Sequence, residues 1–367
     1  MARVAQSVQS DSRPVSVMGR QARPRGSLRF DWLFTLVCCW FVGGVHLDGW
    51  AHNHIPDLET FFTPWHAVLY SGYVVSAAVL GIALLRNHAR GYAWRRALPP
   101  GYAASLAGAA VFAVGGVLDM LWHLLFGIEV SVEALLSPTH LLLATGGVLM
   151  ITGPLRAAWQ RLPGRASFTW RTGLPALLSL TLVLSLLAFF TQFAHPFVDN
   201  WASINVQGTV TPFFDQALGI ASILLQTTLL MAVVLLLVWR WALPFGMLTL
   251  LLAVATALIS VMHDQQPWIA VAVVSGLLAD LLYRRLKPSA ERRIPFRVFA
   301  FVMPVILYGL YFIGMIAHDH GIGWSVHLWV GSTVMAGLVG LLLSYLVVPL
   351  QLPPDDSPSS GAVRTDP

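Results

Sequence analysis

Long apolar runs separated by short polar segments dominate the chain. Runs long enough to cross a bilayer as helices lie near 31–50, 65–85, 102–126, 139–159, 173–194, 214–238, 243–262, 267–283, 297–317 and 325–349. This pattern predicts an all-α polytopic membrane protein with about ten transmembrane helices. The flanking segments 1–29 and 351–367 have no such runs, are rich in Arg, Ser, Pro or Asp, and are predicted to be disordered tails.

Composition supports the same class. Hydrophobic residues make up 56% of the 367 positions and charged residues only 11%, with a mean hydropathy of +0.69. A soluble domain needs far more charge on its surface, so lipid is the expected surroundings of most of the chain. The pI near 9.6 could suggest nucleic acid, but the basic residues fall in short loops between apolar runs. That distribution indicates membrane orientation, and nucleic-acid binding is excluded.

The basic residues between the two tails collect in alternate loops. They are Arg86, Arg90, Arg95 and Arg96; Arg156, Arg161, Arg165 and Arg171; Arg240; and Arg284, Arg285, Lys287, Arg292, Arg293 and Arg297. By the positive-inside rule these loops and both termini are expected in the cytoplasm, in a bacterial-type inner membrane. The chain is expected to divide into a four-helix region at 30–160 and a six-helix region at 161–350.

Histidines follow the opposite distribution. Of the 12 histidines, only His88 lies in a basic loop. The others fall at or near the extracytoplasmic helix ends: His46, His52, His54, His66, His123, His140, His195, His263, His318, His320 and His327. Several Asp and Glu residues accompany them. A face with imidazoles and carboxylates but no Lys or Arg favours cations.

The first predicted helical hairpin carries a compact polar motif. Asp48 and His52 are four residues apart and therefore share one helix face. Thr63 is a good N-cap and Pro64 suits the first helical position, so His66 is expected in the first turn of the returning helix. One hairpin thus brings one Asp and two His to the same membrane level.

The second hairpin repeats this motif. Asp119 and His123 have the same spacing, and Ser137-Pro138 precedes His140. Each copy therefore reads D-x-x-x-H, an acidic loop, and [ST]-P-x-H. A lone D-x-x-x-H pair is usually a capping or hydrogen-bonded pair. The whole composite occurring twice instead predicts two three-ligand metal sites with positions left for water or substrate.

The first copy resembles a known family. Asp48-Gly-Trp-Ala-His52 with Phe62-Thr63-Pro64-Trp65-His66 is similar to the D-G-x-x-H and F-T-P-x-H stretches of the C subunit of the copper-dependent membrane monooxygenases that oxidise methane or ammonia. The resemblance covers roughly 30–160 and extends to the second hairpin, where Asp119 stands at a position commonly Asn in the family. It implies copper ligands at Asp48, His52 and His66, a second metal site at Asp119, His123 and His140, and partner membrane subunits.

Other polar residues at this face are weaker candidates. His54, and His318 and His320 with His327 beyond two glycines, could add ligands, although interfacial helix ends are the plainer interpretation. Asp264 and Asp319 could pair with the histidines beside them. Three acidic residues could orient ligand histidines: Glu59, Glu129 and Glu133.

Two acidic residues are expected in charge pairs away from this face. Asp280 lies four residues before Arg284, which favours a pair on one helix face. Asp31 is expected to pair with Arg29 and Arg86 at the inner edge.

Three functions remain open from the sequence. The first is a metal-centred membrane oxidoreductase, with copper implied by the resemblance and zinc or iron compatible with the same ligands. The second is a metal uptake or homeostasis protein, which would need polar ligands continuing through the bilayer. The third is a structural membrane protein whose polar residues only seal helix ends.

Overall fold

The computed structural model describes residues 23–55, 63–127, 131–162, 164–165, 168–205 and 212–349. Every regular element in these segments is helical. In chain order they are α1 (Leu28–His54), α2 (Pro64–Ala89), η2 (Trp94–Arg96), α3 (Ala103–Phe126), α4 (Val132–Leu136), α5 (Pro138–Ile151), α6 (Gly153–Arg161), α7 (Trp170–Phe190), η4 (Gln192–Ala194), α8 (Pro212–Arg240), α9 (Met247–Met262), α10 (Pro267–Leu286), α11 (Arg293–His318) and α12 (Val326–Val347).

The structure supports a multi-pass membrane protein. Eight helices in the described residues are long and apolar enough to cross a bilayer: α1, α2, α3, the continuous α5–α6 rod, α7, α8, α11 and α12. The other two expected spans are also helices, but α9 has only 16 residues and α10 carries Asp280, Arg284 and Arg285. The count of ten spans and the cytoplasmic termini stay predictions.

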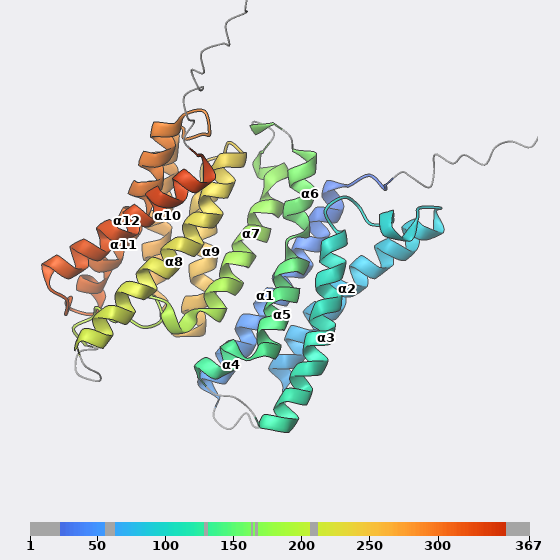
Figure 1. The fold of residues 1–367 in the computed structure, drawn as a ribbon, viewed down its shortest axis with the longest axis horizontal. Helices are drawn as coiled ribbons and strands as arrows, with labels where there is room; N and C mark the ends of the chain where they lie inside the picture. The colour runs from blue at the N-terminus through green and yellow to red at the C-terminus, as the bar shows by residue number, and fades with distance from the viewer. Residues whose placement is uncertain are drawn as a thin grey trace, which may run out of the picture.

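Two groups of helices lie on either side of α7 (Figure 1). The first four spans pack around one apolar core that includes Phe34 and Phe112, and α8 to α12 pack around another. Helix α7 supplies Leu182 and Leu186 to the first core and Leu177 to the second. The expected division near residue 160 is therefore bridged by one helix that belongs to both cores.

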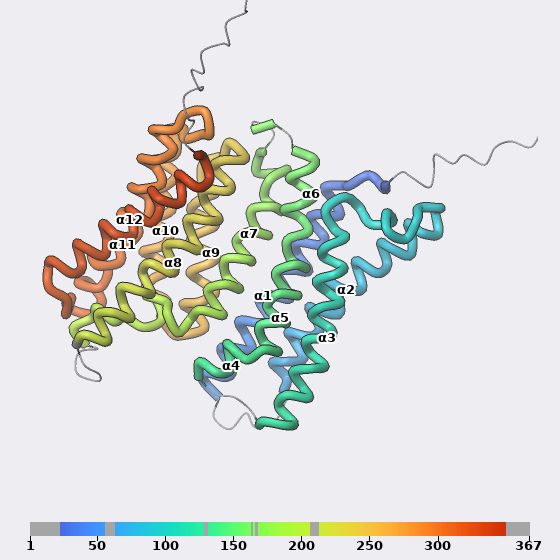
Figure 2. The backbone as a smooth tube through the Cα atoms, in the orientation of Figure 1, coloured from blue at the N-terminus to red at the C-terminus, as the bar shows by residue number. Residues whose placement is uncertain are grey.

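Figure 2 shows the path of the chain from one end of the helices to the other. The residues at these two ends differ in chemistry. Helix α1 has Arg29 near its start and His54 at its end, whereas α2 has His66 near its start and Arg86 near its end. We call the end that carries His52, His66, His123 and His140 the histidine end, and the opposite end, which carries Arg86, Arg161 and Arg240, the arginine end.

The expected partners of Asp31 are wrong. This carboxylate is fully buried, accepts a hydrogen bond from the Tyr102 hydroxyl at 2.6 Å and pairs with the Arg161 guanidinium. Phe30 and Leu33, not Asp31, line the space between α1 and α2. A buried carboxylate needs its partners inside the protein, and Arg161 from α6 reaches it there.

The expected Asp280–Arg284 pair is also wrong. Asp280 accepts hydrogen bonds from the Thr249 hydroxyl at 2.6 Å and the Thr249 amide at 3.0 Å. Helix α9 begins after Gly246, which has no side chain to cap it. The carboxylate of α10 therefore satisfies the free amides at the start of α9.

Candidate metal centre

The start of α2 fixes His66 as the sequence predicts. Thr63 is the N-cap, Pro64 occupies the first helical turn, and the His66 amide donates to Thr63 Oγ1 at 3.1 Å. The same hydroxyl lies 2.9 Å from His66 Nδ1. Thr63 therefore caps the helix and holds the imidazole at once.

Asp48 lies between the two histidines of the first triad, which we define as Asp48, His52 and His66. Its Oδ1 is 3.2 Å from His66 Nδ1, and its Oδ2 is 3.9 Å from His52 Nε2. Asp48 is only 9% exposed, and its Oδ1 is buried without a hydrogen-bond partner of good geometry. A buried carboxylate oxygen in that state is costly.

The second triad, Asp119, His123 and His140, has closely similar dimensions. Asp119 Oδ2 lies 3.5 Å from His123 Nε2, and Oδ1 lies 3.5 Å from His140 Nε2. The two imidazole centroids are 5.6 Å apart, the same separation as between His52 and His66. Here Asp119 is 3% exposed.

Hydrogen bonds orient all three residues of the second triad. His123 Nδ1 lies 3.2 Å from the Gly127 carbonyl, to which it can only donate. Ser137 Oγ lies 2.7 Å from His140 Nδ1. Thr139 donates to Asp119 Oδ1 at 2.8 Å. Both imidazoles therefore turn Nε2 toward the carboxylate, and contacts of this kind fix ligands in metal sites.

Both triads have dimensions that suit a metal ion. In each, one donor atom from each of the three residues lies within 4.8 Å of the other two. Donors bound tetrahedrally at about 2.0–2.1 Å from a metal are about 3.3 Å apart. The carboxylate–imidazole separations of 3.2–3.9 Å are close to that value. Three such ligands leave coordination positions open.

The two hairpins share the packing that supports these residues. Gly44, four residues before Asp48, faces Leu69, and a Cβ there would come within 2.7 Å of the Leu69 Cα. Gly115, four residues before Asp119, faces Leu143, with a Cβ 3.0 Å from its side chain. Leu69 and Leu143 each follow the returning histidine by three residues.

A second pair of contacts repeats in the same register. Gly72 packs against the backbone of Phe41, and Gly146 packs against the backbone of Phe112. Both hairpins therefore read F-x-x-G-x-x-x-D-x-x-x-H and [ST]-P-x-H-x-x-L-x-x-G. Small residues allow close approach of membrane helices. This longer repeat is already present in the sequence, where its signal is the pair of glycines beside the polar positions.

The triads are near one another. The charges of His123 and His140 act on both His52 and His66, so the imidazoles of the two hairpins are within electrostatic range. Tyr70, one turn after His66, is within range of both carboxylates, and its hydroxyl lies against Gly116 of α3.

His54 does not join the first triad. It lies 2.6 Å from Asp264 in the loop between α9 and α10, and this hydrogen bond lowers the pKa of Asp264. Asp264 therefore pairs across the bundle and not with its neighbour His263, which lies 2.6 Å from the Gln192 side chain. The His54–Asp264 contact joins the first hairpin to the second half of the protein.

His195 is also a structural residue. It is buried, and the Phe197 amide donates to its Nδ1 at 3.1 Å. Burial, with a smaller effect from His263, lowers the pKa of His195 to about 3. The imidazole is therefore neutral and holds the loop after α7.

His318, His320 and His327 are not brought together into a third triad. The described residues contain two groups of this kind, and these histidines belong to neither. His318 lies 3.9 Å from Asp319, so the neighbour pair expected for Asp319 is present. His320 adopts a left-handed conformation, and His327 is exposed in the first turn of α12.

The acidic residues expected to orient the ligands are placed only in part. Glu59 and Glu129 lie outside the described residues, and Glu133 is exposed in α4. The described orienting groups are instead Thr63, Ser137, Thr139 and the Gly127 carbonyl. Thr139 was missed because it is the variable position of [ST]-P-x-H, where the first hairpin has Trp65.

No protein-family model, curated protein or solved structure matches the chain. The interpretation of the triads therefore rests on their own geometry.

Proposed function

We propose that this chain is an integral membrane metal-binding protein that holds one metal ion in each triad at the histidine end. The observation that carries the proposal is the twofold occurrence of one carboxylate and two imidazoles whose donor atoms lie within 4.8 Å. Ionisable groups inside a membrane are energetically costly, and they usually mark a functional site. The orphaned Oδ1 of Asp48 is an atom that a cation would satisfy.

Copper is the metal that we propose, on the resemblance to the monooxygenase C subunit. Imidazole and carboxylate ligands suit copper(II), zinc and iron alike, so the metal is the first quantity to measure. An open coordination position at the membrane edge would let oxygen and a small apolar substrate meet the ion. We therefore propose a monooxygenase-like oxidoreductase, with the arginine end in the cytoplasm and with further membrane subunits as partners.

The uptake alternative has less support. Beneath the triads, toward the middle of the helices, the packing residues are Leu69, Leu143, Phe41 and Phe112. Within the described residues no third group of ligands continues the path. These four side chains offer a cation no ligand.

Metal content of the detergent-purified protein, measured by mass spectrometry, tests the proposal. We expect about two copper ions per chain in the wild type, and the loss of one in each of two double variants, His52→Ala/His66→Ala and His123→Ala/His140→Ala. The matched control is His318→Ala/His327→Ala, which removes two histidines at the same end and should keep both ions.

Four results would each contradict the proposal or a part of it. A folded wild type that copurifies with no metal and takes up none on titration would contradict metal binding and favour a structural role. Equal loss of metal in the control variant would contradict the triads as the sites. Zinc or iron in place of copper would keep the sites but refute the proposed metal, and absence of oxygen-dependent oxidation of small apolar substrates by the loaded protein would refute the oxidoreductase.

A further inference from the structure

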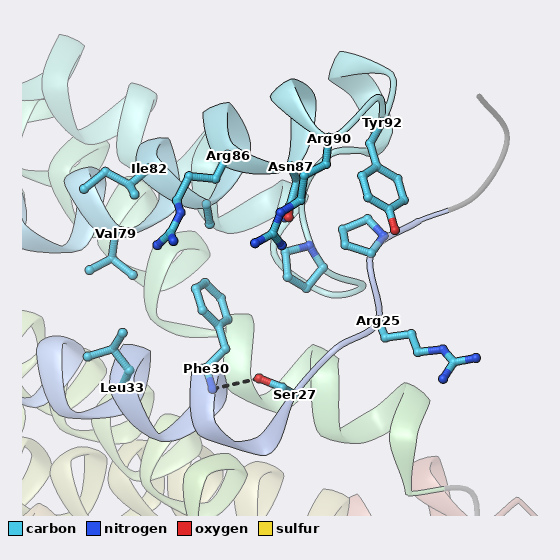
Figure 3. Close-up of a pocket in the computed structure, with 13 residues that line it drawn as sticks. Arg25, Ser27, Phe30, Leu33, Val79, Ile82, Arg86, Asn87, Arg90 and Tyr92 are labelled. Atoms are coloured by element: carbon cyan, nitrogen blue, oxygen red, sulfur yellow. Dashed lines mark hydrogen bonds between the residues drawn. The ribbon is translucent and has the colours of Figure 1, made fainter. Parts of the chain in front are cut away.

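A cavity of about 710 Å³ lies at the arginine end, far along the helices from both triads. It is an open cavity between the start of α1 and the end of α2 (Figure 3). The two helices are in close contact where Gly44 and Gly72 meet the opposite backbone. Beyond that contact toward the arginine end, the space between them is the cavity.

The inner part of the cavity is apolar and reaches the lipid-facing surface. Phe30 and Leu33 line it from α1, and Val79 and Ile82 line it from α2. Leu33 is 49% exposed and Ile82 is 53% exposed. In a transmembrane helix such residues face hydrocarbon, so this part of the cavity is continuous with the acyl-chain region of a bilayer.

The outer part of the cavity is basic. Arg86 and Arg90 line it, and both side chains extend from α2 into the space above Phe30, while Arg25 lies at the mouth and points outward (Figure 3). No acidic residue is among the described residues that line the cavity. Ser27, the N-cap of α1, also lines it and places the positive end of the α1 dipole there.

The two inward arginines lack a carboxylate partner in the described part of the chain. They are four residues apart, which sets like charges on one helix face and is unfavourable. Asp31, the acid that the sequence predicts as a partner of Arg86, is instead held by Tyr102 and Arg161. An anion between Arg86 and Arg90 would remove this repulsion.

The segment that carries Arg90 is rigidly built. The Asn87 side chain donates to the Ala97 carbonyl at 2.8 Å. The His88 imidazole stacks on Trp94 with centroids 3.8 Å apart and lies 3.0 Å from the Tyr92 carbonyl. The backbone at Arg90 is therefore held beside the cavity.

We propose that this cavity binds an anionic phospholipid, with the headgroup phosphate between Arg86 and Arg90 and an acyl chain along the apolar wall. Basic pockets between transmembrane helices recognise anionic headgroups. Guanidinium groups bind phosphate oxygens through paired hydrogen bonds. The site is independent of the metal triads and of the proposed function.

Native mass spectrometry of the full-length protein in detergent tests the site, with phosphatidylglycerol and phosphatidylcholine of identical acyl chains as probes. We expect tighter binding of phosphatidylglycerol. Two arginines near a lipid surface contribute roughly a factor of five each, so Arg86→Gln/Arg90→Gln should weaken its binding about 25-fold. Arg86→Lys/Arg90→Lys, which keeps the charge, should retain most of it.

The matched control is Arg284→Gln/Arg285→Gln on α10, which makes the same change in net charge at the same end. Phosphatidylglycerol binding should remain within about twofold of wild type in this variant, because these residues do not line the cavity. Soluble glycerol phosphate serves as competitor and should not displace the lipid.

Three outcomes would overturn the proposal. Equal affinity for the two lipids would show that the cavity does not recognise an anionic headgroup. An equal loss in the α10 control would reduce the effect to net charge. Displacement by glycerol phosphate would assign the site to a soluble phosphate compound and not to a lipid. Thermal unfolding checks that the glutamine variant is folded. If it is not folded, the lysine variant tests the site, and loss of phosphatidylglycerol binding in a folded lysine variant would contradict a role of positive charge.

Discussion

The two hairpins at the histidine end have the same frame but complete it differently. In the second, Thr139 donates to Asp119 Oδ1. In the first, Trp65 stands at the equivalent position and Asp48 Oδ1 has no hydrogen-bond partner. One site is therefore organised before any ion arrives, whereas the other has an unsatisfied ligand. A repeated motif can thus yield two sites of unequal affinity when one variable position differs.

The orientation of the histidine rings also differs between the two triads. His140 turns Nε2 toward Asp119 and Nδ1 toward Ser137. In the first triad, both Asp48 and Thr63 lie near Nδ1 of His66. Binding an ion with Nε2 would require His66 to turn its ring, and the second triad needs no such change.

The largest expected effect follows from this difference in organisation. In a copper titration against a competing chelator, we expect the second triad to bind about 10–100-fold more tightly than the first, which is the usual contribution of orienting contacts. The His52→Ala/His66→Ala protein isolates the second site, and the His123→Ala/His140→Ala protein isolates the first. Equal affinities in the two proteins would show that the difference in orienting contacts does not change the copper affinity of the triads.

Opposite effects on stability are expected next, from removing the carboxylates of the metal-free protein. Asp119→Ala removes the acceptor of the buried Thr139 hydroxyl, which keeps only a longer contact of 3.3 Å with Ser137 Oγ, and should lower the free energy of unfolding by about 1–3 kcal/mol. Asp48→Ala removes a carboxylate with an unsatisfied oxygen and should be neutral or stabilising by about 1 kcal/mol. Thermal unfolding in detergent measures both. A similar destabilisation by the two variants would show that Asp48 Oδ1 is not an unsatisfied oxygen in the folded protein.

A smaller effect is expected from the threonine alone. Thr139→Val keeps the shape of the side chain but removes the donor to Asp119, so affinity at the second triad should fall about tenfold while the first is unchanged. Thr145→Val is the control, because that exposed threonine donates only within α5, to the Leu141 carbonyl. A loss of affinity in Thr145→Val would point to a general effect on α5.

The smallest effect is expected at the contact between the first hairpin and the second half. Asp264 has a lowered pKa because His54 is hydrogen bonded to it. A lowered pKa stabilises the folded state above the unfolded aspartate value, about 3.9, and this contribution is lost as pH falls through the folded value. Asp264→Asn should therefore slightly lower the melting temperature at pH 6, with less difference from wild type near pH 3. A difference that persists undiminished at low pH would rule out this ion pair as its cause.

Much of the fold could be predicted from the chain alone. Apolar runs report helices directly, because a backbone in lipid must satisfy its hydrogen bonds within the helix. The caps at Thr63 and Ser137 could also be predicted, since capping depends on residues three positions apart. The assembly of each triad could be predicted from two local features. The Asp and the first His are four residues apart on one helix, and the second His follows the N-cap of the returning helix.

What the sequence did not determine involves residues distant along the chain. Asp31 pairs with Arg161, Asp280 caps α9, and His54 reaches Asp264, because each polar group takes the nearest partner in space once the helices pack. His318, His320 and His327 are close in sequence but exposed, and the packed helices do not bring them into one group. The amino-acid sequence by itself thus determined the helices and the composition of the two triads. Only the tertiary structure decided which carboxylate is satisfied and where a basic cavity opens, because both depend on how helices far apart in sequence approach one another.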